Sequence, residues 1–201
     1  MDKKVFEHFK KYDPLLHATA LKITTIKVMR KVKPEGYFLA LCDAIAGQQL
    51  SGKAADAIFA RFQKLYPDGI TAKAVFNTPH EKLRAVGMSN AKARYLKNLA
   101  EAVVNGKLQL NKLEKLSDEE IKEQLTQVKG IGPWTAEMFL MFTLGREDVF
   151  SHGDLGLRKG IKKIYGFSKD PSVKTVERII KKWSPYKTYG SFILWQSLEI
   201  E

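Results

Sequence analysis

Apolar residues recur along much of this chain at the spacing of one face of a helix. Residues 96–104 place leucine, alanine and valine at the i, i+3, i+4, i+7 and i+8 positions, and residues 54–62 repeat the pattern. Residues 37–45 are apolar at nearly every position, which is typical of a helix buried on all sides. No stretch alternates apolar and polar residues as a half-buried strand does. The pattern therefore predicts an all-α protein.

Capping residues mark the expected helix starts. Five of the seven prolines follow a residue suited to a helix N-cap: Asp13-Pro14, Thr78-Pro79, Gly132-Pro133, Asp170-Pro171 and Ser184-Pro185. Thr78 with Glu81 and Ser117 with Glu120 also have the spacing of a capping box. We therefore expect a helix to begin at each of these sites.

The chain is expected to fold as one domain, residues 1–201, made of two helical lobes. The lobes cover about residues 35–124 and 125–201, and the N-terminal segment 1–34 is expected to add to the second lobe. No low-complexity linker separates the lobes, and the sequence has no internal repeat of fixed period. An active-site cleft between two packed lobes is therefore expected.

The charge balance points to a polyanionic partner. The formal net charge is +12. The segment from Arg158 to Lys187 contains ten basic residues and only two acidic ones, Asp170 and Glu177. A solvated lysine-rich surface is the alternative explanation. The longest apolar stretches are too short to span a bilayer, and the N-terminal segment lacks the apolar core of a secretory signal. We expect an intracellular protein that binds nucleic acid and no membrane.

Several kinds of site are excluded by residue counts and spacing. Cys42 is the only cysteine, which rules out an internal disulfide, a four-cysteine zinc site and an iron–sulfur cluster, and its apolar surroundings indicate a core residue. The four histidines show no metal-ligand spacing. Ser151, His152 and Asp154 are too close in sequence to form a hydrolase triad. We expect neither a metal nor a cofactor.

The most informative segment is residues 117–144, SDEEIKEQLTQVKGIGPWTAEMFLMFTL. A capped helix to about Thr126 precedes a turn with two glycines, and a second helix begins at Pro133. Gly130 and Gly132 let the backbone turn tightly and approach a ligand, while Ile131 plugs the space between the helices. Free N–H groups at the start of the second helix suit a phosphate. The segment is interpreted as a helix-hairpin-helix that reads nucleic-acid backbone; a plain turn between core helices is the alternative.

Asp154 is the candidate catalytic residue. It follows Trp134 by twenty residues and precedes a new apolar helical face over residues 155–165. Aspartate is a favoured N-cap, so a purely structural role is the alternative. An aspartate at a helix N-terminus is also held rigidly and kept ionised by the helix dipole.

Two of these segments together resemble a known family. GIGPWTAEMFLMF and DVFSHGDLGLRKGI resemble the helix-hairpin-helix/Gly-Pro-Asp superfamily of DNA glycosylases, and within it the 3-methyladenine DNA glycosylase II branch. Residues 44–55, 87–100 and 183–195 also resemble that branch, so the resemblance covers about residues 35–197. The chain has the length of a compact form without an N-terminal sheet domain.

The resemblance implies a base excision repair enzyme. It would flip alkylated purines of the 3-methyladenine and 7-methylguanine type out of double-stranded DNA and hydrolyse their N-glycosidic bond, as a monomer without cofactor. It would act in the cytoplasm or nucleoid of a prokaryote, or in a nucleus. Relatives that also cleave the strand carry a lysine where this chain has Trp134, so no lyase activity is expected.

Individual site residues follow from the same resemblance. Asp154 matches the catalytic aspartate, and Gln49 matches the side chain that wedges into the gap left by the flipped nucleotide. The base pocket would hold Trp134, Trp195 and Met138, the last at a position where some members of the branch have an aromatic. The residues expected to bind the DNA backbone are Gly130, Ile131, Gly132, Thr135, Ser51 and Lys53.

The residue types suit this chemistry. An alkylated purine already carries positive charge, so it leaves readily once a carboxylate stabilises the oxocarbenium-like sugar. Tryptophan faces attract a cationic base by about 1–2 kcal/mol when desolvated. A non-catalytic helix-hairpin-helix module that binds DNA structure is the main alternative, but it gives no reason for Asp154 and the spaced tryptophans. The second alternative is a bifunctional glycosylase/lyase, which the missing lysine at position 134 disfavours.

Overall fold

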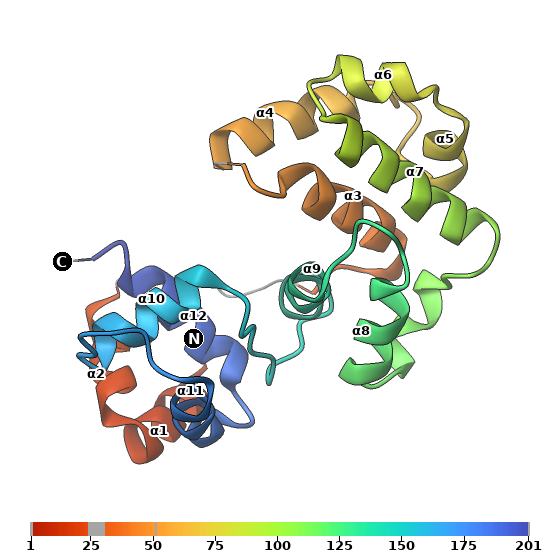
Figure 1. The fold of residues 1–201 in the computed structure, drawn as a ribbon. Coiled ribbons are helices and arrows are strands. Elements are labelled where there is room, and N and C mark those ends of the chain that lie inside the picture. The colour runs from red at the N-terminus through yellow and green to blue at the C-terminus, as the bar shows by residue number, and fades with distance from the viewer. Residues whose placement is uncertain (1, 24–30, 51, 201) are drawn as a thin grey trace. The chain divides into compact units, whose positions relative to one another are not determined.

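The computed structural model describes residues 2–23, 31–50 and 52–200, and every regular element in these residues is helical (Figure 1). The α-helices are α1 (Lys3–Tyr12), α2 (Pro14–Lys22), α3 (Tyr37–Gly47), α4 (Gly52–Gln63), α5 (Ala72–Asn77), α6 (His80–Ala85), α7 (Asn90–Val104), α8 (Asp118–Thr126), α9 (Pro133–Met138), α10 (Leu155–Ile164), α11 (Val173–Ile180) and α12 (Lys187–Ser197). Three short 3₁₀ helices are η1 (Pro34–Gly36), η2 (Leu110–Lys115) and η4 (Lys181–Trp183), and η3 (Phe139–Thr143) is a π-helical turn. The all-α prediction is confirmed.

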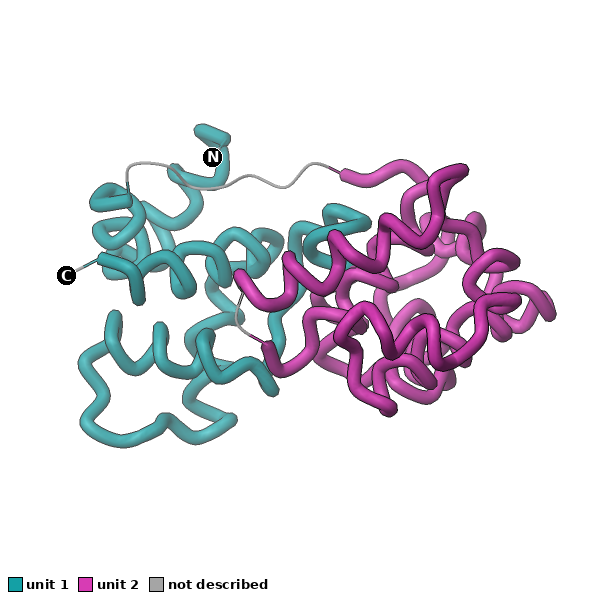
Figure 2. The backbone as a smooth tube through the Cα atoms, turned by 90° about the horizontal axis from the view of Figure 1, so that it is seen from above, with its two compact units in different colours: residues 1–30, 140–201 teal, residues 31–139 magenta. Residues whose placement is uncertain are grey.

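The chain forms two compact units (Figure 2). Unit 1 consists of Met1–Arg30 and Leu140–Glu201, and unit 2 is Lys31–Phe139. The N-terminal segment therefore groups with the C-terminal helices. The expected lobe boundary at residue 124 is corrected to residue 139, because α9 packs against α3 and α8 and so carries the hairpin into unit 2.

Unit 2 is built around α3, the helix expected over residues 37–45. Tyr37, Leu41, Cys42 and Ile45 are completely buried, and α3 packs against α4, α7 and α9. Burial raises the pKa of the Cys42 thiol, which keeps it protonated and unreactive, as expected of a core residue. The apolar face predicted for α7 is buried over its first three turns, and only its last residues leave the core.

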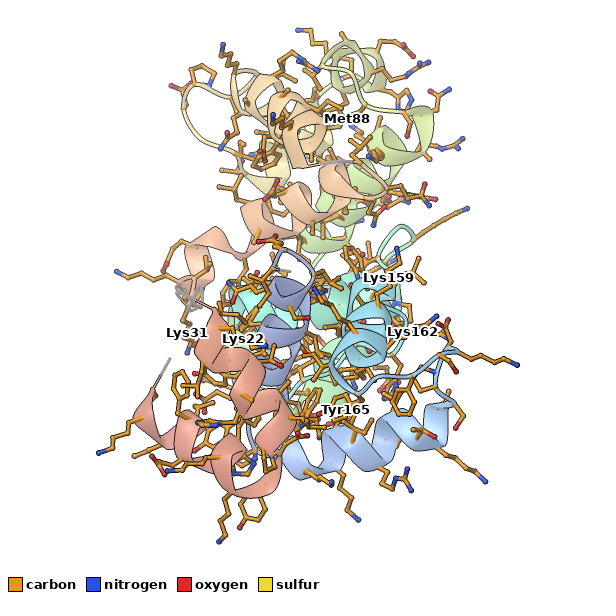
Figure 3. The ribbon with its side chains drawn as sticks, turned by 90° about the vertical axis from the view of Figure 1, so that its left-hand side faces the viewer. Lys22, Lys31, Met88, Lys159, Lys162 and Tyr165 are labelled. Atoms are coloured by element: carbon orange, nitrogen blue, oxygen red, sulfur yellow. The ribbon has the colours of Figure 1, made fainter. Side chains whose placement is uncertain are left out.

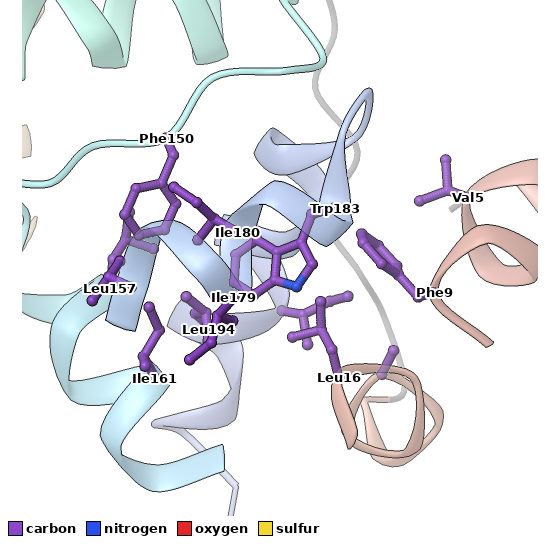
Figure 4. Close-up of a cluster of buried hydrophobic side chains, with 13 residues drawn as sticks. Val5, Phe9, Leu16, Phe150, Leu157, Ile161, Ile179, Ile180, Trp183 and Leu194 are labelled. Atoms are coloured by element: carbon purple, nitrogen blue, oxygen red, sulfur yellow. The ribbon is translucent and has the colours of Figure 1, made fainter. Parts of the chain in front are cut away.

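Unit 1 is built around Trp183, which is completely buried (Figure 4). Its ring packs in a cluster with Phe9 of α1 and Leu16 of α2. The indole Nε1–H donates to Asp13 Oδ2 at 2.9 Å, and Tyr165 donates to the same oxygen. The Leu16 N–H donates to Asp13 Oδ1 at 3.1 Å, so Asp13 caps α2 as its position before Pro14 predicts. One buried carboxylate thereby connects the N-terminal helices to the C-terminal ones.

Two further helix starts are confirmed. Ser117 and Glu120 form a complete capping box at the start of α8, and those hydrogen bonds lower the pKa of Glu120. The helix α9 begins at Pro133, after Gly132.

Three predicted starts are wrong, because the expected cap has another partner. The Thr78 hydroxyl donates to Ala74 O at the end of α5, and α6 begins at His80 without a side-chain cap. Ser172 caps α11 in place of Asp170. The Ser184 hydroxyl donates to the Asp148 carboxylate at 2.9 Å, and α12 begins later, at Lys187.

Candidate active site and nucleic-acid interface

Asp154 of unit 1 is held by a helix terminus and by an indole. It is the N-cap of α10, where its Oδ1 accepts the Leu157 N–H at 2.8 Å, so the predicted cap is confirmed. The same oxygen accepts the Trp195 Nε1–H at 3.0 Å. Asp154 is only 8% exposed. Two donors therefore hold this carboxylate oxygen in place, and the N-terminal end of the α10 dipole lies beside it.

An aromatic group lies beside this carboxylate. Trp195, on α12, stacks on Phe142 with ring centroids 5.7 Å apart and planes 26° apart, and Phe192 packs against both rings. Phe142 is 44% exposed, so one aromatic side chain of the group is open to solvent. Trp195 thus belongs both to the edge of the unit 1 core and to the surroundings of Asp154.

The close contact between Trp195 and Asp154 requires a glycine at position 156. A Cβ atom there would lie 2.9 Å from Trp195 Cδ1 and 3.1 Å from Asp154 Oδ1. Real Cβ atoms hardly ever come so close to a neighbour, so any side chain would push the indole or the carboxylate aside.

The loop before Asp154 is anchored to α11 and α12. The buried Thr188 hydroxyl donates to Arg146 O at 2.7 Å and accepts the Val149 N–H at 3.0 Å. Nearer to Asp154, His152 Nε2 lies 2.7 Å from the Glu177 carboxylate of α11. Asp154 is therefore presented by a fixed loop, because α12 holds both this loop and Trp195.

In unit 2, the predicted hairpin joins α8 to α9. Gly130 has a φ of +113°, which confirms the expected tight turn, and Ile131 is buried, at 3% exposed. The Tyr95 ring covers Gly130: a Cβ at Gly130 would lie 2.2 Å from Tyr95 Cγ. The Asn98 side chain also donates to Lys129 O at 3.0 Å. The turn is thus braced by α7.

The two hairpin glycines are expected to fail in different ways when replaced. Gly130→Ala meets Tyr95 in a left-handed backbone region, which should lower the free energy of unfolding by about 3 kcal/mol and the melting temperature by about 10 °C. Gly132→Ala meets no atom within 4 Å and should melt like the wild type, but its new methyl group should weaken duplex binding. Thermal melting and equilibrium binding measure both. Equal melting temperatures for the two variants would contradict this description of the turn.

A pocket of about 490 Å³ lies beside the hairpin, within unit 2. It is lined by the hairpin, the start of α7 and the end of α3: Gly130, Gly132, Trp134, Thr135, Ser89, Ala91, Lys92, Tyr95, Gln48 and Gln49. Trp134 is 40% exposed, whereas Thr135 is buried. The Lys92 ammonium donates to Ala46 O at 2.8 Å, and partial burial lowers its pKa.

The structure thus divides the predicted site residues between the units. Gln49, Gly130, Gly132, Trp134 and Thr135 surround one pocket of unit 2, whereas Asp154 and Trp195 lie together in unit 1. The remaining residues are a half-buried Met138 on α9, the buried Ile131, an exposed Lys53 in the first turn of α4, and Ser51, which lies outside the described residues.

Sequence reasoning missed three residues of these sites. Phe142 lies in an apolar run with Leu140 and Met141, which are completely buried, and no sequence signal separates it from them. Tyr95 and Gln48 contact the hairpin from α7 and from the end of α3. The only signal for Gln48 is its place beside Gln49 in GQQLS.

The basic run between Arg158 and Lys187 is partly neutralised within unit 1. Arg158 and Lys162 pair with Asp170 at 3.4 and 3.8 Å, and Lys187 pairs with Asp148 at 3.3 Å. Other cations of the run, including Lys159 on α10 (Figure 3), are exposed: Lys159, Lys169, Lys174, Arg178, Lys181 and Lys182. These exposed cations give unit 1 a surface suited to a polyanion.

The described residues also bear on membrane and metal binding. None of the helices described has both the length and the apolar character needed to cross a membrane. Across the same residues, histidine, cysteine, aspartate and glutamate form no group of three arranged to hold a metal ion.

Comparison with known proteins agrees with these features. The model of the HhH-GPD superfamily of base excision DNA repair proteins matches residues 42–185. DNA-3-methyladenine glycosylase 1 of Schizosaccharomyces pombe is 38% identical over 163 residues, which are 80% of this chain and 72% of that protein.

Two solved structures are similar over nearly the whole chain. The 3-methyladenine DNA glycosylase of S. pombe, in complex with abasic DNA, superposes with a TM-score of 0.89 at 33% identity and covers 98% of each chain. The DNA-3-methyladenine glycosidase of Bacillus halodurans gives a TM-score of 0.83 at 35% identity, over 99% of this chain and 90% of that one.

Proposed function

This chain belongs to the HhH-GPD superfamily of base excision DNA repair proteins and is a DNA glycosylase, and we propose the following substrate and mechanism for it. It acts as a monomer on double-stranded DNA and hydrolyses the N-glycosidic bond of alkylated purines of the 3-methyladenine and 7-methylguanine type. It leaves an intact abasic strand.

The observation that carries the proposal is the rigid Asp154 carboxylate beside Trp195 and Phe142. As the glycosidic bond breaks, the sugar becomes oxocarbenium-like, and a carboxylate already held in place stabilises that charge without reorganising. The same carboxylate orients or deprotonates the incoming water. No second carboxylate is needed, because the alkylated base leaves without prior protonation.

The aromatic group accounts for the preference for a cationic base. Indole and phenyl faces attract a positively charged ring by about 1–2 kcal/mol when water is excluded. The exposed Phe142 ring, stacked on Trp195, offers such a face within unit 1. Trp134 offers a second, in unit 2, and Met138 follows it on α9.

Position 134 supports an enzyme without lyase activity. Strand cleavage by this class of enzyme requires an amine that attacks the sugar and forms a Schiff base. An indole cannot do so. Trp134 at this position therefore supports a purely hydrolytic enzyme.

The hairpin and the Gln49 turn, residues Gln48–Leu50, account for DNA binding. The backbone at Gly130–Gly132, with Thr135, binds phosphates without reading bases. Lys53 adds a contact from the first turn of α4, and Ser51 keeps the same role on the strength of the sequence alone. Gln49 is exposed on a short turn with a φ of +57°. Glutamine is long enough to enter the base stack and to hydrogen-bond the orphaned partner base, which keeps the gap filled while the target is flipped.

Release of free bases from methylated duplex DNA tests the proposal. We expect the protein to liberate 3-methyladenine and 7-methylguanine, detected by chromatography, and to leave normal bases in place. The substrate should be bound more weakly as salt rises, because phosphate contacts release counterions. Tight binding to duplex DNA with no released base would instead identify a non-catalytic DNA-binding module.

A further inference from the structure

Gln48 connects the Gln49 turn to the hairpin through a single side-chain nitrogen. Its Nε2 donates to Gly130 O at 2.9 Å and to Thr135 Oγ1 at 3.2 Å. Both acceptors belong to the hairpin and the first turn of α9, and Thr135 is buried. A carboxamide nitrogen has only two hydrogens, so both are used and the side chain is fixed in orientation.

The turn on the other side of Gln48 has an unusual backbone. Gln49 is the one non-glycine residue with positive φ in the described part of the chain, and its side chain is exposed. A left-handed conformation of this kind persists only where the surroundings hold it. Backbone hydrogen bonds from Gln48 N–H to Ile45 O, at 3.4 Å, and from Leu50 N–H to Gly47 O, at 3.2 Å, tie the turn to α3. The Gln48 side chain ties it to the hairpin.

We propose that Gln48 is a positioning residue that makes the Gln49 turn and the hairpin one rigid body. When the hairpin holds the DNA backbone, the position of Gln49 relative to the base stack is then already determined. Gln48 acts through Gln49, with its own carboxamide facing the hairpin. This inference rests on the proposed function, in which the hairpin binds phosphates and Gln49 fills the gap.

Gln48→Met tests the coupling, because methionine has nearly the same length and no donor. Single-turnover excision is measured for 7-methylguanine opposite cytosine and opposite thymine, where the weaker pair already favours flipping. We expect the rate on the cytosine pair to fall about ten-fold and the rate on the mismatch to fall less than about two-fold, because filling the gap matters most where unstacking is hardest. Combining Gln48→Met with Gln49→Ala should slow excision no further than Gln49→Ala alone.

Thr135 provides a matched pair of milder variants. Thr135→Val removes one acceptor of Gln48 and should reproduce part of the effect, whereas Thr135→Ser keeps the hydroxyl and should behave like the wild type. All rates are measured at saturating protein, so that a change in phosphate binding at Thr135 does not enter the comparison of the two substrates. Equal rate losses on the two substrates, or additive losses with Gln49→Ala, would overturn the proposal and reduce Gln48 to a structural residue.

A fluorescence readout separates this inference from the proposed function. A 2-aminopurine beside the target position brightens when the stack opens, whether or not a base is released. If wild-type protein opens the stack but releases no base, the proposed function fails, and the inference still stands if Gln48→Met abolishes the signal. If Gln48→Met opens the stack as fully as the wild type does, the inference fails.

Discussion

Replacing Asp154 with asparagine is expected to slow base release about a thousand-fold, the scale seen when one preorganised electrostatic group is removed from a transition state. Asparagine retains an Oδ1 that accepts the Leu157 N–H and the Trp195 Nε1–H, so α10 keeps its cap and the indole its partner. The negative charge is lost, and Oδ2 is replaced by an NH2 group. Single-turnover excision and duplex binding measure the two effects, and affinity should stay within about two-fold.

Asp148→Asn is the matched control for this substitution. Asp148 lies in the same loop, and its carboxylate accepts from the Ser184 hydroxyl and from the Lys187 N–H at the start of α12. Loss of that charge should lower the melting temperature slightly and leave the excision rate near that of the wild type. Wild-type excision by Asp154→Asn would show that Asp154 is only a helix cap and would remove the proposed mechanism.

The second large effect is expected from Gly156→Ala, which should slow excision about a hundred-fold. The added Cβ would displace Trp195 or Asp154 by several tenths of an ångström, and small misplacements of reacting groups have effects of this size. Gly153→Ala is the control, because a Cβ there meets no atom within 4 Å. Single-turnover rates for the two variants are compared on the same alkylated duplex.

Melting temperature and duplex affinity are also measured for Gly156→Ala and Gly153→Ala. Both glycine variants should bind duplex DNA like the wild type, since the hairpin is in unit 2. If Gly156→Ala retained the wild-type rate, the contact between the indole and the carboxylate would have no part in catalysis.

Local signals allowed much of the fold and part of the site to be predicted. The uniformly apolar run over residues 37–45 identified α3, and the spacing of Ser117 and Glu120 identified the start of α8. The two glycines around Ile131 identified the hairpin. Each of these features is set by residues within a few positions of one another, which is the range over which sequence patterns act.

The features that the sequence did not predict depend on contacts between distant segments. Ser184 has the chemistry of a cap, but Asp148, 36 residues away, takes its hydroxyl. Gln48 contacts Gly130 and Thr135 across more than 80 residues, and nothing in GQQLS distinguishes its carboxamide from that of Gln49. The exposure of Phe142 similarly depends on how η3 packs against α12.

The central claim is that one carboxylate releases an alkylated purine without a covalent enzyme–DNA intermediate. It is tested most directly by a single turnover of the wild-type protein on a duplex with one 7-methylguanine, carried out in the presence of borohydride. The account predicts free 7-methylguanine in an amount equal to the substrate, an uncut abasic strand and no enzyme–DNA adduct. A borohydride-trapped adduct, or a substrate that keeps its base, would contradict it.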